Sequence, residues 1–211
     1  LLGRSFEELR KQAENGDTAA MAELGGRYRN GVHGATKDFA EAVKWYQKAA
    51  LHGNPKAQYA LGVCYQRGEG VLPDDKEGVV WYRKAAEQGY AVAQYALGFC
   101  YYYGVGMPRD FGEAVAWYRK AAEQGCAIAQ YALGVCYYCG TGVTQDYREA
   151  AEWYRQAAER GNTVAQYNLG LCYFKGIGVP QYYVEAYRWA NLAAAQGEQE
   201  YIKLRDGLTR V

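Results

Sequence analysis

Serine and histidine are almost missing from this chain of 211 residues. Ser5 is its one serine, and His33 and His52 are its two histidines. Acyl transfer lacks its usual nucleophile, because the single serine has no suitable lysine or histidine beside it. The clustered histidines that many metal sites use are missing as well. The sequence therefore predicts no catalytic residue, no metal and no cofactor.

The chain also lacks an excess of charge of either sign and has no long apolar run. The 24 Lys and Arg residues nearly balance the 23 Asp and Glu residues, which disfavours binding to DNA or RNA. A membrane-spanning helix needs about 20 consecutive apolar residues, and the chain has no such run. Its start shows no secretory pattern, but it begins at Leu1 rather than Met, so removal of a leader or an upstream domain stays open. We expect no nucleic-acid binding and no membrane insertion.

What the chain does contain is a repeat of 36 residues. Tryptophan and a Leu-Gly pair both recur at this step, with the leucine 16 residues after each preceding tryptophan. The recurring residues are Trp45, Trp81, Trp117, Trp153 and Trp189, with Leu61-Gly62, Leu97-Gly98, Leu133-Gly134 and Leu169-Gly170. A fixed period of this length indicates an array of stacked supersecondary units.

Each repeat carries start and stop signals for two helices. An aspartate followed three residues later by a glutamate, as in Asp74 and Glu77, favours the start of a first helix. Gly89 suits the end of that helix, because glycine readily adopts positive φ. Asn54 followed by Pro55 favours the start of a second helix, which then ends at a G-x-G pair. The repeat is therefore interpreted as helix, tight turn, helix and glycine-rich loop.

The repeated residues resemble a known family. The pattern A-x-x-W-Y-x-x-A-A-x-x-G-x-x-x-A-Q-Y-x-L-G-x-x-Y-x-x-G-x-G-V is similar to the Sel1-like repeat, a relative of the tetratricopeptide repeat, over about residues 6–197. The resemblance implies an all-α fold, a right-handed α-α superhelix (solenoid) of about five to six 36-residue helix-turn-helix repeats. It also implies a concave surface lined mainly by first helices, and adaptor or scaffold duty in bacterial envelope assembly, host interaction or membrane-associated degradation complexes.

One solenoid domain is expected to span residues 1–211. Residues 1–37 form a degenerate first repeat in this interpretation, and residues 38–197 form the regular repeats. Residues 198–211 depart from the repeat pattern. A solenoid needs an atypical end to shield its last apolar face, so we expect this segment to form a capping helix.

Four of the six cysteines occupy one repeat position, as Cys64, Cys100, Cys136 and Cys172. Equivalent positions in adjacent repeats lie about 8–10 Å or more apart, whereas a disulfide needs Cα atoms within about 7 Å. We therefore expect free, buried thiols and no disulfide. Cys136 and Cys139 form a C-x-x-C without a second pair, which is weak evidence for a zinc site.

A cysteine-rich branch of the Sel1-like proteins, described as binding or hydrolysing β-lactams, gives an enzymatic alternative. In that branch two cysteines eight residues apart staple the helices of each repeat. The corresponding positions of this chain hold alanine and glutamine, as Ala86/Gln94, Ala122/Gln130 and Ala158/Gln166. The resemblance to that branch therefore fails at the residues that define it.

Exposed positions on the first helices are the main candidate binding site. Stacked hairpins align equivalent residues into rows, so two rows should lie side by side. The first row is Lys44, Val80, Ala116 and Glu152, and the second is Gln47, Arg83, Arg119 and Arg155. The arginines could hold acidic groups of a partner through their planar forks. Alternatively, they form solvated pairs with the glutamates four residues on, Glu87, Glu123 and Glu159.

A second candidate is a patch of aromatic residues near the ends of second helices. These are Tyr102, Tyr103, Tyr138 and Phe174, which differ between repeats. Amphipathic aromatic side chains make good anchors at interfaces. Core or edge packing is the competing interpretation.

The leading hypothesis is a non-enzymatic scaffold that binds a peptide or a partner protein on the concave first-helix face. A β-lactam-binding or hydrolysing enzyme is one alternative, and a purely structural or consensus-like engineered array is another. Free thiols favour a reducing cytoplasm, but a periplasmic or secreted location stays open if a leader was removed. The oligomeric state is left open.

The cysteine interpretation is testable by thiol titration under denaturing, non-reducing conditions. We expect all six cysteines to titrate as free thiols, because the four repeated ones are too far apart to pair. A count of two or fewer would contradict this expectation.

Overall fold

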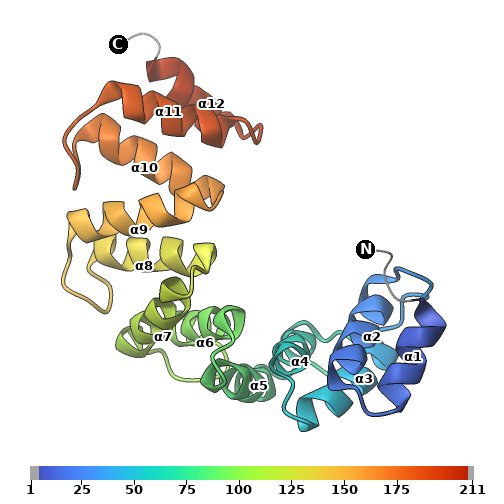
Figure 1. The fold of residues 1–211 in the computed structure, drawn as a ribbon. Coiled ribbons are helices and arrows are strands. Elements are labelled where there is room, and N and C mark those ends of the chain that lie inside the picture. Colours follow the sequence, from blue (N-terminus) through green and yellow to red (C-terminus); the bar gives the residue numbers. More distant parts are fainter. Residues whose placement is uncertain (1–4, 209–211) are drawn as a thin grey trace. The chain divides into compact units, whose positions relative to one another are not determined.

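The computed structural model describes residues 5–208, and within this range the chain forms twelve α-helices and no strand (Figure 1). The predicted all-α fold of helical hairpins is thereby confirmed. The helices are α1 (Phe6–Glu14), α2 (Thr18–Asn30), α3 (Phe39–Leu51), α4 (Pro55–Arg67), α5 (Asp75–Glu87), α6 (Ala91–Tyr103), α7 (Phe111–Glu123), α8 (Ala127–Cys139), α9 (Tyr147–Glu159), α10 (Thr163–Lys175), α11 (Tyr183–Ala194) and α12 (Gln199–Leu208). None of the helices in the described range is long and apolar enough to span a bilayer.

The chain divides into two compact units, Leu1–Arg109 and Asp110–Val211. The first unit contains α1 to α6 and the second contains α7 to α12. Within each unit, every helix packs against the next one along the chain, and α2 also contacts α4. The odd-numbered helices are the first helices of the repeats, and the even-numbered ones are the second helices.

The helix boundaries lie at the predicted capping residues. The Asp38 carboxylate accepts a hydrogen bond from the Glu41 backbone N–H at 3.0 Å, at the start of α3. The Asn54 side chain accepts one from the Ala57 N–H at 3.0 Å, before the first-turn proline of α4. Local hydrogen bonds of this kind satisfy N–H groups that the helix itself leaves unpaired.

Two second helices form without such a side-chain cap. Tyr90 precedes α6 and Cys126 precedes α8, and neither side chain makes a capping hydrogen bond. Both helices are nevertheless 13 residues long, as are the capped helices α4 and α10. Their leucines Leu97 and Leu133 are completely buried. Tertiary packing, rather than a local cap, therefore stabilises these two helices.

The G-x-G pair that follows α4, α6, α8 and α10 has two separate physical reasons, which are seen after α4. Gly68 is the C-cap and has the left-handed conformation, with φ of 65°. Gly70 also has positive φ, and a Cβ there would lie 2.3 Å from the Phe39 carbonyl oxygen at the start of α3. The first glycine is thus needed for its conformation, and the second also for the close approach of two backbone segments.

In two of the second helices, α4 and α8, a tyrosine ring of the following first helix packs against a glycine in the middle of the helix. A Cβ added to Gly62 would lie 2.6 Å from the Tyr82 ring, and one added to Gly134 would lie 2.7 Å from the Tyr154 ring. The backbone carbonyl oxygens of Gly78 and Ala150 are also within about 3 Å of these added atoms, at 2.9 and 3.2 Å. The structure thus identifies the tyrosine ring that fills the space beside this helical glycine.

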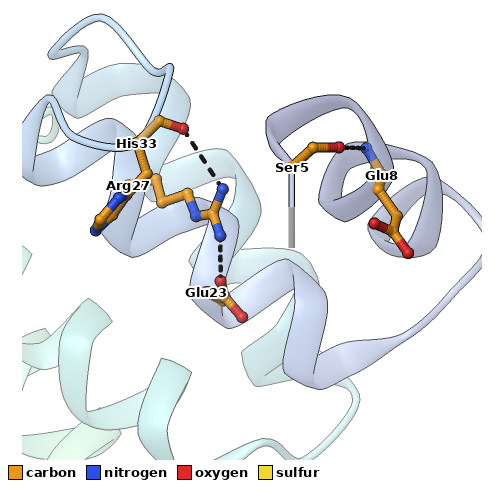
Figure 2. A network of polar contacts seen from close by, with 5 residues as sticks. All are labelled: Ser5, Glu8, Glu23, Arg27 and His33. Atoms are coloured by element: carbon orange, nitrogen blue, oxygen red, sulfur yellow. Dashed lines mark hydrogen bonds and ion pairs between the residues drawn. The ribbon is translucent and has the colours of Figure 1, made fainter. Parts of the chain in front are cut away.

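The first repeat has its own polar contacts (Figure 2). The Ser5 hydroxyl caps α1 by accepting a hydrogen bond from the Glu8 N–H at 3.1 Å. Arg27 is 6% exposed, forms a 2.6 Å ion pair with Glu23, and donates to the His33 carbonyl at 3.5 Å. His33 has a φ of 52°, which is uncommon for a residue with a side chain. This loop therefore departs from the G-x-G form of the later repeats.

The last helix lies where the C-terminal segment was expected to fold. Leu208 of α12 joins a buried cluster with Ala186 and Ala190 of α11, and the Tyr201 ring lies 4.8 Å from that of Tyr167. This packing is what a capping helix requires. The capping role itself, and the division into degenerate, regular and capping segments, stay predictions.

Adjacent glycines in α2 provide a matched test of the tyrosine contact. A Cβ at Gly25 would lie 2.7 Å from the buried Tyr46 ring, whereas one at Gly26 would meet only the Tyr46 hydroxyl, at 3.7 Å. We expect Gly25→Ala to lower the free energy of unfolding by about 1–3 kcal/mol through overpacking. Gly26→Ala should raise it by up to about 1 kcal/mol, because alanine is the better helix former. Urea unfolding of both variants checks this, and equal effects would contradict the packing argument.

Candidate functional site

The first candidate row is exposed, as expected from the sequence. Lys44 and Val80 lie on the first unit, and Ala116 and Glu152 lie on the second. Val80 is 43% exposed, which is high for an apolar side chain. The Lys44 ammonium pairs with Glu41 at 2.5 Å, and this hydrogen bond raises the pKa of Lys44.

The arginines of the second row are held by tyrosines, not by the glutamates four residues further on. Arg83 donates a hydrogen bond to the Tyr101 hydroxyl at 2.9 Å, and Arg119 donates one to the Tyr137 hydroxyl at 2.6 Å. Arg155 bonds Tyr173 in the same way at 3.0 Å. Each tyrosine lies 18 residues further on, in the second helix of the same repeat.

The expected pairs four residues apart are absent from residues 5–208, where no ion pair joins these arginines to Glu87, Glu123 or Glu159. That interpretation was wrong, because the half-buried guanidinium groups point toward the second helix. Gln47, at the start of the row, is half-buried too. Each guanidinium has five N–H donors and uses only one on its tyrosine, so donors remain for a partner.

The aromatic candidates occur in both units and pack locally. Tyr102 and Tyr103 close α6 in the first unit, with ring centroids 4.9 Å apart. In the second unit, Tyr138 packs 5.2 Å from the Tyr147 ring and Phe174 packs 6.0 Å from the Tyr183 ring. The role of these four side chains as a binding patch stays a prediction.

Tyr138 instead lines a pocket between two second helices of the second unit. This α8–α10 pocket has a volume of about 290 Å³. Its lining comes from α8 (Tyr131, Val135, Tyr138, Cys139), α9 (Tyr154), α10 (Asn168, Leu171, Cys172, Lys175) and the following loop (Ile177). The buried Tyr154 ring, which fills the Gly134 contact, forms part of the wall.

A smaller pocket of about 210 Å³ occupies the same repeat positions between α4 and α6. It is lined by Tyr59, Val63, Gln66, Arg67, Tyr82, Tyr95, Ala96 and Phe99. Neither pocket was predicted from the sequence, because the repeat pattern pointed to the first-helix face as the main surface. The available signal was variation at one repeat position, which holds Arg67, Tyr103, Cys139 and Lys175 in successive copies.

All six cysteines are free in the structure. Cys64, Cys100, Cys136 and Cys172 are buried, whereas Cys139 is exposed at the rim of the α8–α10 pocket. Burial raises the pKa of the Cys136 thiol to about 12 and that of Cys172 to about 11. Protonated thiols are poor nucleophiles, so the buried cysteines act as packing groups. The described residues contain no group of three metal-ligating side chains.

The sequence model of the Sel1 repeat matches five consecutive segments, 18–54, 55–90, 91–126, 127–162 and 163–198. The chain belongs to the Sel1 repeat family. Sel1 repeat proteins are helical repeat proteins that take part in protein–protein interactions.

Two bacterial Sel1 structures resemble the chain over most of its length. The first is c5321, a protective antigen of uropathogenic Escherichia coli, with 41% identity and a TM-score of 0.88; the match covers 94% of this chain and 42% of that one. The second is a Sel1 repeat protein of Oxalobacter formigenes, with 35% identity and a TM-score of 0.86, covering 96% of this chain and 82% of that one.

A plant protein shares a shorter Sel1 segment. The ERAD-associated E3 ubiquitin-protein ligase component HRD3A of Arabidopsis thaliana is 37% identical over 65 residues. That segment covers 31% of this chain and 10% of the plant protein. The match therefore relates the repeats, and most of the plant protein lies outside it.

In this Sel1 array, glutamine stands at one of the two positions that the cysteine-rich branch uses for its staple. The Gln94 amide donates to the Ala86 carbonyl at 3.2 Å, and the Gln130 amide donates to the Ala122 carbonyl at 3.1 Å. Gln166 does the same with Ala158 at 3.1 Å. A buried hydrogen bond thus joins the two helices of a repeat where that branch has a covalent bond, so thiol oxidation is not needed to hold the hairpin closed.

The buried thiols make stability depend on alkaline pH. Their pKa values are raised by burial above the ordinary value near 9, to about 11 for Cys64, Cys100 and Cys172 and about 12 for Cys136. In the unfolded chain these thiols ionise at a lower pH than in the folded chain. Their contribution to the free energy of unfolding is therefore fully present below about pH 9 and is lost as the pH rises through 11 to 12. We expect the melting temperature to fall over that range.

The matched variants for this test are Cys136→Ala and Cys139→Ala. Removing the buried thiol should make the fall in melting temperature with pH shallower, whereas removing the exposed thiol should leave it unchanged. An identical pH dependence in both variants would contradict the assignment to buried thiols.

Proposed function

We propose that this chain is a non-enzymatic scaffold that binds a peptide or a segment of a partner protein along its first helices. The observation that carries the proposal is the Arg–Tyr hydrogen bond, repeated at Arg83, Arg119 and Arg155. A guanidinium that is already held in place loses less conformational entropy when a partner binds. The repeated bond therefore prepares a row of donors for acidic groups or a peptide carboxylate.

Arg83 and Arg119 are the strongest contributors in this proposal. Neither has an ion-pair partner within the described part of the chain, so their positive charge is uncompensated. Arg155 already contacts the Glu152 carboxylate at 3.2 Å, which offsets part of its charge. The neighbouring row adds the exposed apolar Val80 on the first unit and the acidic Glu152 on the second.

The similarity to other proteins supports a role alongside partners. The Arabidopsis thaliana protein that shares the Sel1 segment is named as a component of a ubiquitin-protein ligase, which is an assembly. From this similarity we propose for the present chain only that its repeats contact a partner protein. The hydrogen-bonded glutamines in place of cysteine staples give the β-lactam alternative no structural support. Turnover of a β-lactam by the purified chain would contradict the proposal.

The test compares quantitative pull-downs with the wild-type chain, Arg83→Ala/Arg119→Ala, and the control Glu87→Ala/Glu123→Ala. The control removes exposed charges from the same two helices at positions outside the rows. A true partner should be lost with the arginine variant and retained with the control.

Affinity measurements on that partner then test the role of the hydrogen bond. Arg119→Ala should weaken binding at least about tenfold, since a charge-assisted hydrogen bond contributes about 1.5–3 kcal/mol. Tyr137→Phe keeps the guanidinium but frees it, and should weaken binding about two- to tenfold. Unchanged affinity of Arg83→Ala/Arg119→Ala would move the binding surface away from the first helices.

A further inference from the structure

The α8–α10 pocket is a second surface, separate from the first-helix rows. Apolar groups form much of it, namely Val135, Leu171, Ile177 and the rings of Tyr131, Tyr138 and Tyr154. Tyr154 is only 3% exposed, and its ring lies 6.0 Å from that of Tyr131 and 6.5 Å from that of Tyr138. Rings packed in this way make a wall that is already formed before a ligand enters.

Four substitutions distinguish this pocket from its counterpart between α4 and α6, and one of them is Leu171 in place of Phe99. Tyr138 stands where the first unit has Gln66, and Gln66 there accepts a hydrogen bond from the Tyr82 hydroxyl at 2.7 Å. Asn168 stands in place of Ala96, and Cys139 in place of Arg67. The second-unit pocket therefore has its amide at Asn168 instead of at the Gln66 position, lacks the guanidinium, and is the larger of the two.

Lys175 provides the one charge in the lining of the α8–α10 pocket. It is exposed, and within residues 5–208 it makes no ion pair. No Asp or Glu lines the pocket, so its charge stays positive overall. In the first unit the same repeat position is Tyr103, which carries no charge. An apolar pocket with an unpaired cation complements an apolar group that lies next to an anion.

We propose that the α8–α10 pocket binds a partner's peptide that inserts one large apolar side chain and places a neighbouring Asp or Glu carboxylate beside Lys175. The volume of about 290 Å³ lies at the lower end of ligand pockets and suits one side chain rather than a whole cofactor. Anchoring a single large side chain in a formed pocket is how many interfaces concentrate their affinity. The Asn168 amide, on the same wall, is placed to bond the peptide backbone.

This site does not depend on the arginine row, so the two proposals fail independently. The peptide would contact second helices, whereas the proposed scaffold surface lies on first helices. A peptide whose affinity follows Arg83→Ala/Arg119→Ala but not changes at Lys175 would belong to the first-helix surface.

The test uses three fluorescein-labelled heptapeptides and the full chain, with binding measured by fluorescence polarisation. One peptide has a central Phe flanked by Glu on both sides, the second has Phe flanked by Lys, and the third has Ala flanked by Glu. We expect the Glu-Phe-Glu peptide to bind at least tenfold more tightly than either of the others. Equal binding of the three, or no binding of the first up to millimolar concentration, would overturn the proposal.

Variants then locate the binding site. Lys175→Gln should weaken binding of the Glu-Phe-Glu peptide at least about tenfold, whereas Lys203→Gln removes an exposed lysine elsewhere in the same unit and should change nothing. Leu171→Phe copies the residue that the first unit carries at this position, Phe99, so the fold should tolerate it while the pocket becomes smaller. It should weaken binding of the peptide, and its melting temperature provides the folding control.

The exposed thiol of Cys139 gives an independent readout at the rim of the pocket. Saturating Glu-Phe-Glu peptide should slow its reaction with a thiol reagent several-fold, and Lys175→Gln should remove that protection at the same peptide concentration. Unchanged reactivity in the presence of bound peptide would place the peptide elsewhere. Self-association that disappears with Lys175→Gln would instead assign the pocket to a second copy of the chain.

Discussion

The contact between a tyrosine ring and a helical glycine organises the packing of α3 on α2, of α5 on α4 and of α9 on α8. The ring of Tyr46, Tyr82 or Tyr154 lies where the side chain of Gly25, Gly62 or Gly134 would otherwise stand. Because the tyrosine comes from the next first helix, the contact sets how closely one repeat packs on the preceding second helix. Glycine weakens a helix by about 1 kcal/mol relative to alanine, and the buried ring offsets that loss. The same ring then forms part of the wall between successive second helices, so the packing contact also builds the pocket.

The two candidate surfaces lie on different helices of the repeats, one on the first helices and the other between second helices. On the first helices, arginines reach tyrosines 18 residues further on and are held at the surface by hydrogen bonds. Between second helices, residues near the helix ends vary from copy to copy around a constant aromatic wall. The residues that recur in every repeat thus build the scaffold. The residues that differ between repeats determine which chemical groups each surface can bind.

The hairpins are closed by polar contacts in place of covalent ones. Glutamine amides, three of them buried, donate to alanine carbonyls eight residues earlier, from Gln58 to Ala50 and in the three following repeats. An amide N–H that pairs with a backbone carbonyl avoids the cost of leaving either the donor or that acceptor unpaired. Burial keeps the repeated cysteines protonated, and so they serve as apolar packing residues beside these bonds.

The period, the helix boundaries and the fold class could be predicted from the sequence alone. They depend on local signals, such as the Asp38 cap and the Gly68 terminus, which act within a few residues and repeat 36 residues apart. The exposure of Val80 followed from the same periodicity. The tertiary structure decided the rest: Arg83 bonds Tyr101 rather than Glu87, and Tyr138 lines a pocket with Lys175. These contacts join different helices, and helical periodicity places a side chain on a face without determining which neighbour it meets there.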